Sequence, residues 1–157
     1  MALTHLDESG RARMVDVGLK PESTRTATAE GAIRMSVEAF RQVAEHAIAK
    51  GDPLAVSEIA GTMAAKRTAD LIPLCHPLGL DQVEVRALLD EALPGVRVRG
   101  TVRARGRTGV EMEALTAVSV ALLSVYDMVK SADRGMEIVT VRLVEKTGGT
   151  RGDWRRE

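Results

Sequence analysis

LDQVEVRALLDEALPGVRVRGTVRAR, residues 80–105, alternates apolar and polar side chains on both sides of Pro94-Gly95. Alternation with a period of two is typical of strands that bury one face, and a Pro-Gly pair is typical of a turn. The segment therefore predicts two antiparallel strands, Leu80 to Leu89 and Val96 to Arg105, joined by a turn.

The elements on either side of this hairpin predict an α+β fold. A strand is expected from Thr24 to Met35, with a bend or bulge at Gly31, and a last strand from Glu137 to Glu145. Apolar residues at helical spacing predict helices at 37–48, 53–69 and 110–130, the first capped by Ser36. This order suits a ferredoxin-like sandwich, in which helices pack on one face of an antiparallel sheet. Residues 1–23 are expected to form a flexible arm, 24–147 a single domain and 148–157 a tail.

The composition favours a cytoplasmic protein without membrane contact. Acidic and basic residues number 22 each, so no net charge favours nucleic acid or an anionic membrane. The single cysteine, Cys75, suits a reducing compartment, and no signal-peptide pattern is found at the N-terminus. The longest apolar stretch, Ala114 to Tyr126, is too short to span a membrane.

The same apolar stretch predicts a helix that needs cover on all sides. Because a domain of 157 residues covers such a helix only partly, we expect subunit contacts along Ala114 to Val125. Burial entirely within one chain is the alternative.

KRTADLIPLCHP, residues 66–77, ends a helical pattern in a loop framed by Pro73 and Pro77. Each proline fixes its own φ and keeps the preceding residue out of the helical region, so the loop holds Cys75 and His76 in a rigid frame. An ordinary loop with a buried cysteine and a hydrogen-bonded histidine is the alternative. Three histidines and one cysteine do not form a spaced ligand set, so we expect no zinc site.

Lysines are rare among the basic residues, five against seventeen arginines, and two of them end predicted helices. Asp127 and Lys130 stand three positions apart on one helix face, where a carboxylate and an ammonium meet. Asp127 also lies near the negative end of the helix dipole, which indicates a raised pKa and acid/base use. The alternatives are a weak surface ion pair and, for Lys50 and Lys130, a cation that stabilises a helix end.

The Pro-framed motif and GVEMEA at 109–114 together resemble the cyclic pyranopterin monophosphate synthases, also called molybdenum cofactor biosynthesis protein C. The resemblance runs from Met14-Val15-Asp16-Val17 to Lys146-Thr147-Gly148-Gly149. It implies the same ferredoxin-like fold and a homohexamer built from three dimers, with active sites at subunit contacts.

The resemblance also implies the reaction. A cyclised dihydroguanosine triphosphate, made from GTP by a radical-SAM cyclase, is converted to cyclic pyranopterin monophosphate with release of diphosphate. No cofactor is expected, and Mg²⁺ bound with the triphosphate is left open. Asp127 and Lys130 are implied as acid/base residues assisted by Lys50, and the implied substrate-binding residues are Leu74, Cys75, His76, Met112, Glu113, Lys66, Arg25 and Lys146.

The chain departs from the family pattern at two places. Arg107 stands where the family usually has lysine, and Thr150-Arg151 replaces its usual Lys-Ser. Arginine at 107 can hold a phosphate but cannot donate a proton.

A second class of function rests on the odd-numbered arginines from Arg97 to Arg107. An unbroken strand presents them on one face, as in a ferredoxin-like module that binds RNA or nucleotides. The strand pair lacks the aromatic residues on which bases stack, so an enzyme is the favoured prediction.

Overall fold

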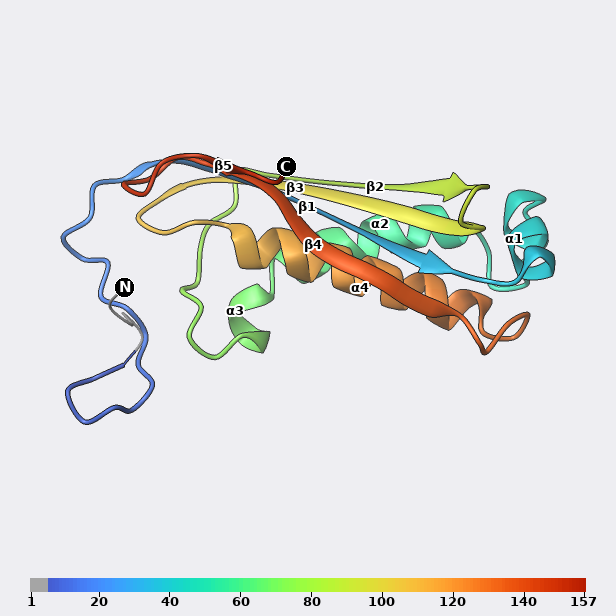
Figure 1. Cartoon of the computed structure of the whole chain (residues 1–157), viewed down its shortest axis with the longest axis horizontal. Helices are drawn as coiled ribbons and strands as arrows, with labels where there is room; N and C mark the ends of the chain where they lie inside the picture. Colours follow the sequence, from blue (N-terminus) through green and yellow to red (C-terminus); the bar gives the residue numbers. More distant parts are fainter. Residues whose placement is uncertain (1–5) are drawn as a thin grey trace.

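The computed structural model describes residues 6–157. Five antiparallel strands form one sheet in the order β2-β3-β1-β4-β5, and the helices cover one face of it (Figure 1). The elements are β1 (Ser23–Arg34), α1 (Val37–Ala44), α2 (Pro53–Ala65), α3 (Thr68–Leu71), β2 (Gln82–Asp90), β3 (Gly95–Gly106), α4 (Glu111–Val129), β4 (Glu137–Thr147) and β5 (Trp154–Arg155). The predicted α+β sandwich of ferredoxin-like type is confirmed.

The hairpin predicted from residues 80–105 is present as β2 and β3. Its register pairs Gln82 with Arg103 and closes with Asp90 opposite Gly95. Gly95 also faces β1, where a Cβ would stand 2.0 Å from the carbonyl oxygen of Ile33. Glycine at position 95 therefore permits the close approach of β1 as well as the turn between β2 and β3.

β1 lies at the centre of the sheet, between β3 and β4. Its pairing with β4 shifts register between Thr28 and Ala29 and again between Ala32 and Ile33, so the irregularities lie on either side of Gly31. A Cβ on Gly31 would stand 2.7 Å from Leu122 Cδ1 and 2.8 Å from Thr140 O. This glycine is required for close packing against α4, which is a different reason from the bulge predicted at that position.

The first two predicted helices end earlier than expected. Ser36 caps α1 by accepting a hydrogen bond from the Ala39 amide at 3.2 Å, but the helix ends at Ala44. The second pattern divides into α2 and the single turn α3, and the Thr68 hydroxyl donates to the Ala65 carbonyl at 2.9 Å at this break. A threonine hydroxyl that donates to a helix carbonyl in this way competes with the backbone hydrogen bonds of the helix.

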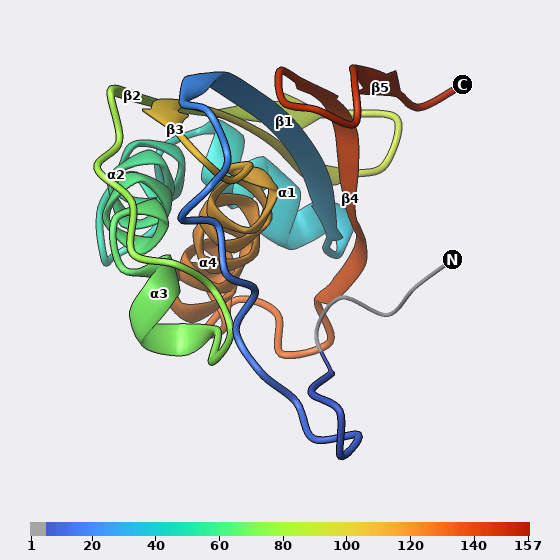
Figure 2. The same ribbon diagram turned by 90° about the vertical axis from the view of Figure 1, so that its left-hand side faces the viewer.

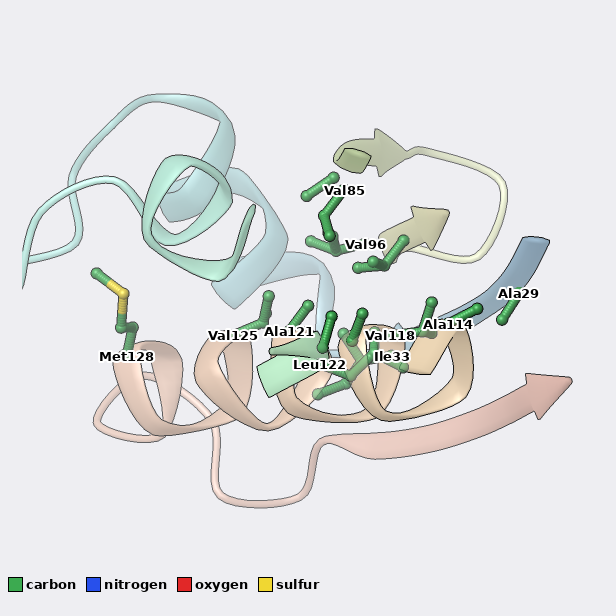
Figure 3. Close-up of a cluster of buried hydrophobic side chains, with 14 of the residues drawn as sticks. Ala29, Ile33, Val85, Val96, Ala114, Val118, Ala121, Leu122, Val125 and Met128 are labelled. Carbon is green, nitrogen blue, oxygen red and sulfur yellow. The ribbon is translucent and has the colours of Figure 1, made fainter. Parts of the chain in front are cut away.

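α4 is the central helix of the core and is covered mostly within the chain (Figure 3). One side packs against β1, β3 and β4, and another against α2. Small residues permit the close contact, since a Cβ on Gly61 of α2 would stand 2.8 Å from the Ala117 carbonyl oxygen. Ala114, Ala117, Val118, Ala121, Leu122 and Val125 are completely buried. Intramolecular burial therefore accounts for most of the apolar pattern that had indicated subunit contacts, and Leu123 is left 56% exposed.

By length and hydropathy alone, α4 qualifies as a helix that could cross a membrane. More than half of its apolar window is buried inside the fold, where α4 lies under the sheet and beside α2 (Figure 2). Its apolar composition is thus explained by the core.

Candidate functional site

A cavity of about 340 Å³ opens at one end of the sheet. The start of β1, the ends of β3 and β4, the Pro-framed loop and the first turn of α4 meet there, at the end of the molecule nearest the N-terminal segment (Figure 1). Of the residues implied as substrate-binding, the cavity is lined by Arg25, Leu74, Cys75, His76, Met112 and Lys146. Segments more than 100 residues apart in the chain thus contribute to one wall.

Arg25 is a buried cation without a carboxylate partner among residues 6–157. It lies on the inner side of β1, is 8% exposed, and donates from Nε to the Gly106 carbonyl at 3.3 Å. No other hydrogen bond from its guanidinium is formed within this part of the chain. Burying an unpaired charge is costly, so the free guanidinium nitrogens at a cavity wall indicate a site for an anion.

Three further cations line the cavity that the resemblance had not assigned: Lys20, Arg107 and Arg151. Arg107 lies 3.9 Å from Glu22, which is not part of the lining. Glu111 is the single acidic side chain among the lining residues. The signal for Lys20 was its rarity as one of five lysines, and the signal for Arg107 and Arg151 was departure from the family pattern. The excess of positive charge suits a polyphosphate.

Cys75 and Glu113 form a hydrogen-bonded pair at the base of this region. The thiol donates to Glu113 Oε1 at 3.5 Å, and Oε2 is buried without a partner in the described chain. Glu113 is 2% exposed, so it lies behind the cavity wall. Burial raises the pKa of the Glu113 carboxyl, and burial together with the nearby Glu113 charge raises the pKa of the Cys75 thiol to about 11. Cys75 is therefore a thiol at neutral pH and not a nucleophile.

A second cluster lies at the opposite end of α4. Lys130 Nζ donates to Asp127 Oδ1 at 2.6 Å, and Lys50 Nζ donates to Asp127 Oδ2 at 3.1 Å and to the Asp127 carbonyl at 2.9 Å. The pairing of Asp127 with Lys130 follows the i, i+3 prediction. Lys50 comes from the segment after α1, 77 residues away, so only the fold brings it to the same carboxylate.

The pKa of Asp127 is shifted in the direction opposite to the expectation. The hydrogen bonds from Lys130 and Lys50, followed by their positive charges, lower it. The unfavourable helix dipole is outweighed because two ammonium groups lie within direct contact of a half-exposed carboxylate. Asp127 is therefore ionised at neutral pH.

The cavity and the lysine cluster are separated by the length of α4. Met112 lies in the first turn and Asp127 in the last turn of a 19-residue helix, whose ends are roughly 28 Å apart at 1.5 Å per residue. In Figure 1 the two regions are at opposite ends of the molecule. A single small molecule cannot contact both within one chain.

Lys66 belongs to neither cluster. It follows the last turn of α2 and lines shallow grooves between α2 and β2, beside Thr62 and Val83. The structure therefore does not bring Lys66 to the cations of the cavity within one chain.

The arginines of β3 lie on the outer face of the sheet, as the alternation predicted. Arg97 pairs with Asp90, and Arg99 lies 3.8 Å from both Glu30 and Glu145. Arg107 lies beyond the strand and lines the cavity. Acidic neighbours interrupt the positive charge of this face, which argues against a continuous surface for a nucleic acid backbone.

Comparison with known proteins gives consistent matches over nearly the whole chain. Residues 14–149 match the model of the MoaC family. The chain is 58% identical over 152 residues to the cyclic pyranopterin monophosphate synthase of Brucella ovis, covering 97% of this chain and 92% of that protein. The synthase of Brucella melitensis biotype 2 has the same identity and coverage, and that of Brucella canis is 57% identical.

Proposed function

Since the chain belongs to the MoaC family, we propose that it is a cyclic pyranopterin monophosphate synthase, a lyase of molybdenum cofactor biosynthesis. Its substrate would be the cyclised dihydroguanosine triphosphate that a radical-SAM cyclase makes from GTP. Diphosphate would be released with the pterin product, and the reaction would take place in the cytoplasm.

The observation that carries the proposal is the cavity at the start of α4. Arg25, Lys146 and His76 converge there with Lys20, Arg107 and Arg151, against one carboxylate in the lining. Apart from Arg107 beside Glu22, none of these groups forms an ion pair within residues 6–157, and a triphosphate supplies the matching negative charge. Leu74, Cys75 and Met112 provide a less polar wall beside them, which suits the flat heterocycle of the same ligand, with Glu113 behind it.

The lysine cluster provides the acid/base groups. Opening the five-membered ring of the purine and building a pterin needs protons to be added and removed at several atoms. In this cluster Asp127 holds two ammonium groups in fixed positions, 2.6 and 3.1 Å from its oxygens. Lys130 and Lys50 can donate protons to the substrate and regain them, while Asp127 positions both ammonium groups.

Because the two clusters are a helix length apart, each active site would combine residues from two copies. The cavity of one chain would bind the triphosphate, and Asp127, Lys130 and Lys50 of a second chain would complete the site. Lys66, which belongs to neither cluster in one chain, would also reach a site through a subunit contact. A hexamer of three dimers satisfies this requirement with closed symmetry.

Turnover of the cyclised triphosphate by purified protein tests the proposal. Mass spectrometry should detect cyclic pyranopterin monophosphate and one diphosphate per turnover. Purified oligomer that binds the substrate but leaves its mass unchanged, with and without Mg²⁺, would refute the assignment.

A further inference from the structure

The loop after β4 lies against the one buried guanidinium of the cavity. Three glycines in this loop have positive φ: Gly148 at 87°, Gly149 at 90° and Gly152 at 72°. All three therefore adopt a backbone conformation that is unfavourable for other residues, but their surroundings differ.

The space beside each glycine distinguishes their roles. A Cβ on Gly149 would stand 1.8 Å from Arg25 Nη1 and 2.9 Å from Arg25 Cζ. A Cβ on Gly148 would meet backbone, 2.1 Å from the Thr24 carbonyl oxygen, and one on Gly152 would meet no atom within 4 Å. Of these three glycines, only Gly149 has the end of a flexible side chain where its Cβ would stand.

Arg25 is held from the other side by a single hydrogen bond. Its Nε donates to the Gly106 carbonyl at 3.3 Å, and Nη1 and Nη2 have no hydrogen-bond partner in residues 6–157. The guanidinium thus lies against the end of β3 through Nε and against the backbone of Gly149 through Nη1. Any side chain at position 149 would need the volume that Nη1 occupies.

We propose that Gly149 is a positioning residue for phosphate binding: its missing side chain leaves the space in which the Arg25 guanidinium faces the cavity. This inference rests on the proposed function for the identity of the phosphate ligand. It adds a second reason for glycine at this position, besides the positive φ: a side chain there would also displace the Arg25 guanidinium.

Three alanine substitutions separate this role from backbone strain, with inorganic triphosphate as the probe in titration calorimetry. Gly149→Ala should fold, because a flexible head group can move away, and should lose affinity by roughly 10- to 100-fold, the range expected for charge-assisted hydrogen bonds. Gly152→Ala imposes the same kind of strain without the clash and should bind as the unmodified protein does. In Gly148→Ala the added methyl group clashes with the Thr24 backbone carbonyl, which cannot move aside, so this variant should be the least stable of the three.

A double variant keeps the test decisive if Gly149→Ala is poorly folded. The double variant carries Gly149→Ala and Arg25→Ala, so the guanidinium that obstructs the new methyl group is absent. Its urea midpoint should be higher than that of Gly149→Ala alone. The affinity of the double variant for triphosphate should equal that of Arg25→Ala, because both changes remove one interaction. Additive losses in affinity, or a Gly149→Ala protein that binds as tightly as Gly152→Ala, would overturn the proposal.

The proposed function can fail separately. If the unmodified protein binds triphosphate but does not convert the cyclised nucleotide, the reaction assignment fails while the role of Gly149 is still measured by binding. If turnover is normal in Gly149→Ala and triphosphate affinity is unchanged, the positioning role fails and the reaction assignment stands.

Discussion

The two ends of α4 hold their charged groups in opposite ways. At the first turn, Arg25 is buried without an acidic partner and further cations face the same cavity. At the last turn, Asp127 is half-exposed and contacts two lysines directly. At one end the buried Arg25 has no acidic partner in residues 6–157, and at the other end two ammonium groups share one carboxylate.

This difference indicates different tasks. Cations that repel one another around a cavity destabilise the empty protein, and a bound polyphosphate removes that cost. A carboxylate between two ammonium groups needs no ligand to be stable, so its geometry is set before the substrate arrives. The first arrangement is suited to binding and the second to proton transfer at fixed positions.

The largest effect is expected at the lysine cluster. Lys130→Arg keeps the positive charge but replaces the ammonium group with a guanidinium, which does not give up its proton, so turnover should fall by a factor of about 10²–10⁴. Asp127→Asn keeps the shape of the side chain but releases both ammonium groups, and should reduce turnover similarly. Steady-state assays, with urea unfolding and light scattering as controls, should show unchanged fold and assembly. Near-normal turnover in both variants would remove this cluster from the catalytic assignment.

Co-expression of two defective variants tests whether the cavity of one subunit and the lysine cluster of another form one active site. Co-expressed Arg25→Ala and Asp127→Asn chains should recover roughly a quarter of the unmodified activity, because half of randomly paired dimers contain one intact site. The matched control combines two changes at the same end, Asp127→Asn with Lys130→Arg, and should recover nothing. Equal activity in the test and the control would place each whole site within one chain.

A smaller effect is expected for Glu113, and it depends on pH. Burial raises the pKa of its carboxyl above the ordinary value near 4.5, so the folded protein binds this proton more tightly than the unfolded chain. The stabilisation is complete below the unfolded pKa and is lost as the pH rises through the folded pKa. Glu113→Gln should therefore match the unmodified protein near pH 4 and be the more stable of the two near pH 8.

Urea unfolding at a series of pH values measures this difference. The titratable groups near the carboxyl are the Cys75 thiol on the Pro-framed loop and Glu111 on α4, and Glu111→Gln is the control for charge alone. The opposite result would be an unmodified protein whose free energy of unfolding falls below that of Glu113→Gln as the pH is lowered. It would show that the folded-state pKa of Glu113 is lowered and that its carboxyl is ionised in the folded protein.

The smallest effect is expected on the outer face of the sheet. Arg103→Ser removes a β3 cation that is remote from the lysine cluster and outside the cavity lining. Turnover and triphosphate affinity should change less than about twofold, the scale of a surface substitution. A larger loss of affinity for single-stranded RNA than for triphosphate would favour the alternative nucleic-acid function.

Local patterns predicted the elements and one side-chain contact of the candidate site. The period of two in residues 80–105 gave the hairpin, and apolar spacing gave α4 to within one residue at each end. Asp127 and Lys130 were paired correctly because three residues nearly complete a helical turn. The predicted direction of the Asp127 pKa shift was wrong because the hydrogen bond from Lys130, followed by that from the distant Lys50, outweighs the helix dipole.

The amino-acid sequence by itself determined the α+β order of elements, the family and six of the residues that line the cavity. Only the tertiary structure decided that Arg25 lies against Gly149, that Cys75 contacts Glu113, that Lys50 joins Asp127 and that Lys66 lies apart. The reason is physical. Helix and strand periods are fixed by backbone geometry over a few residues, whereas these contacts join segments brought together by burial of the shared core.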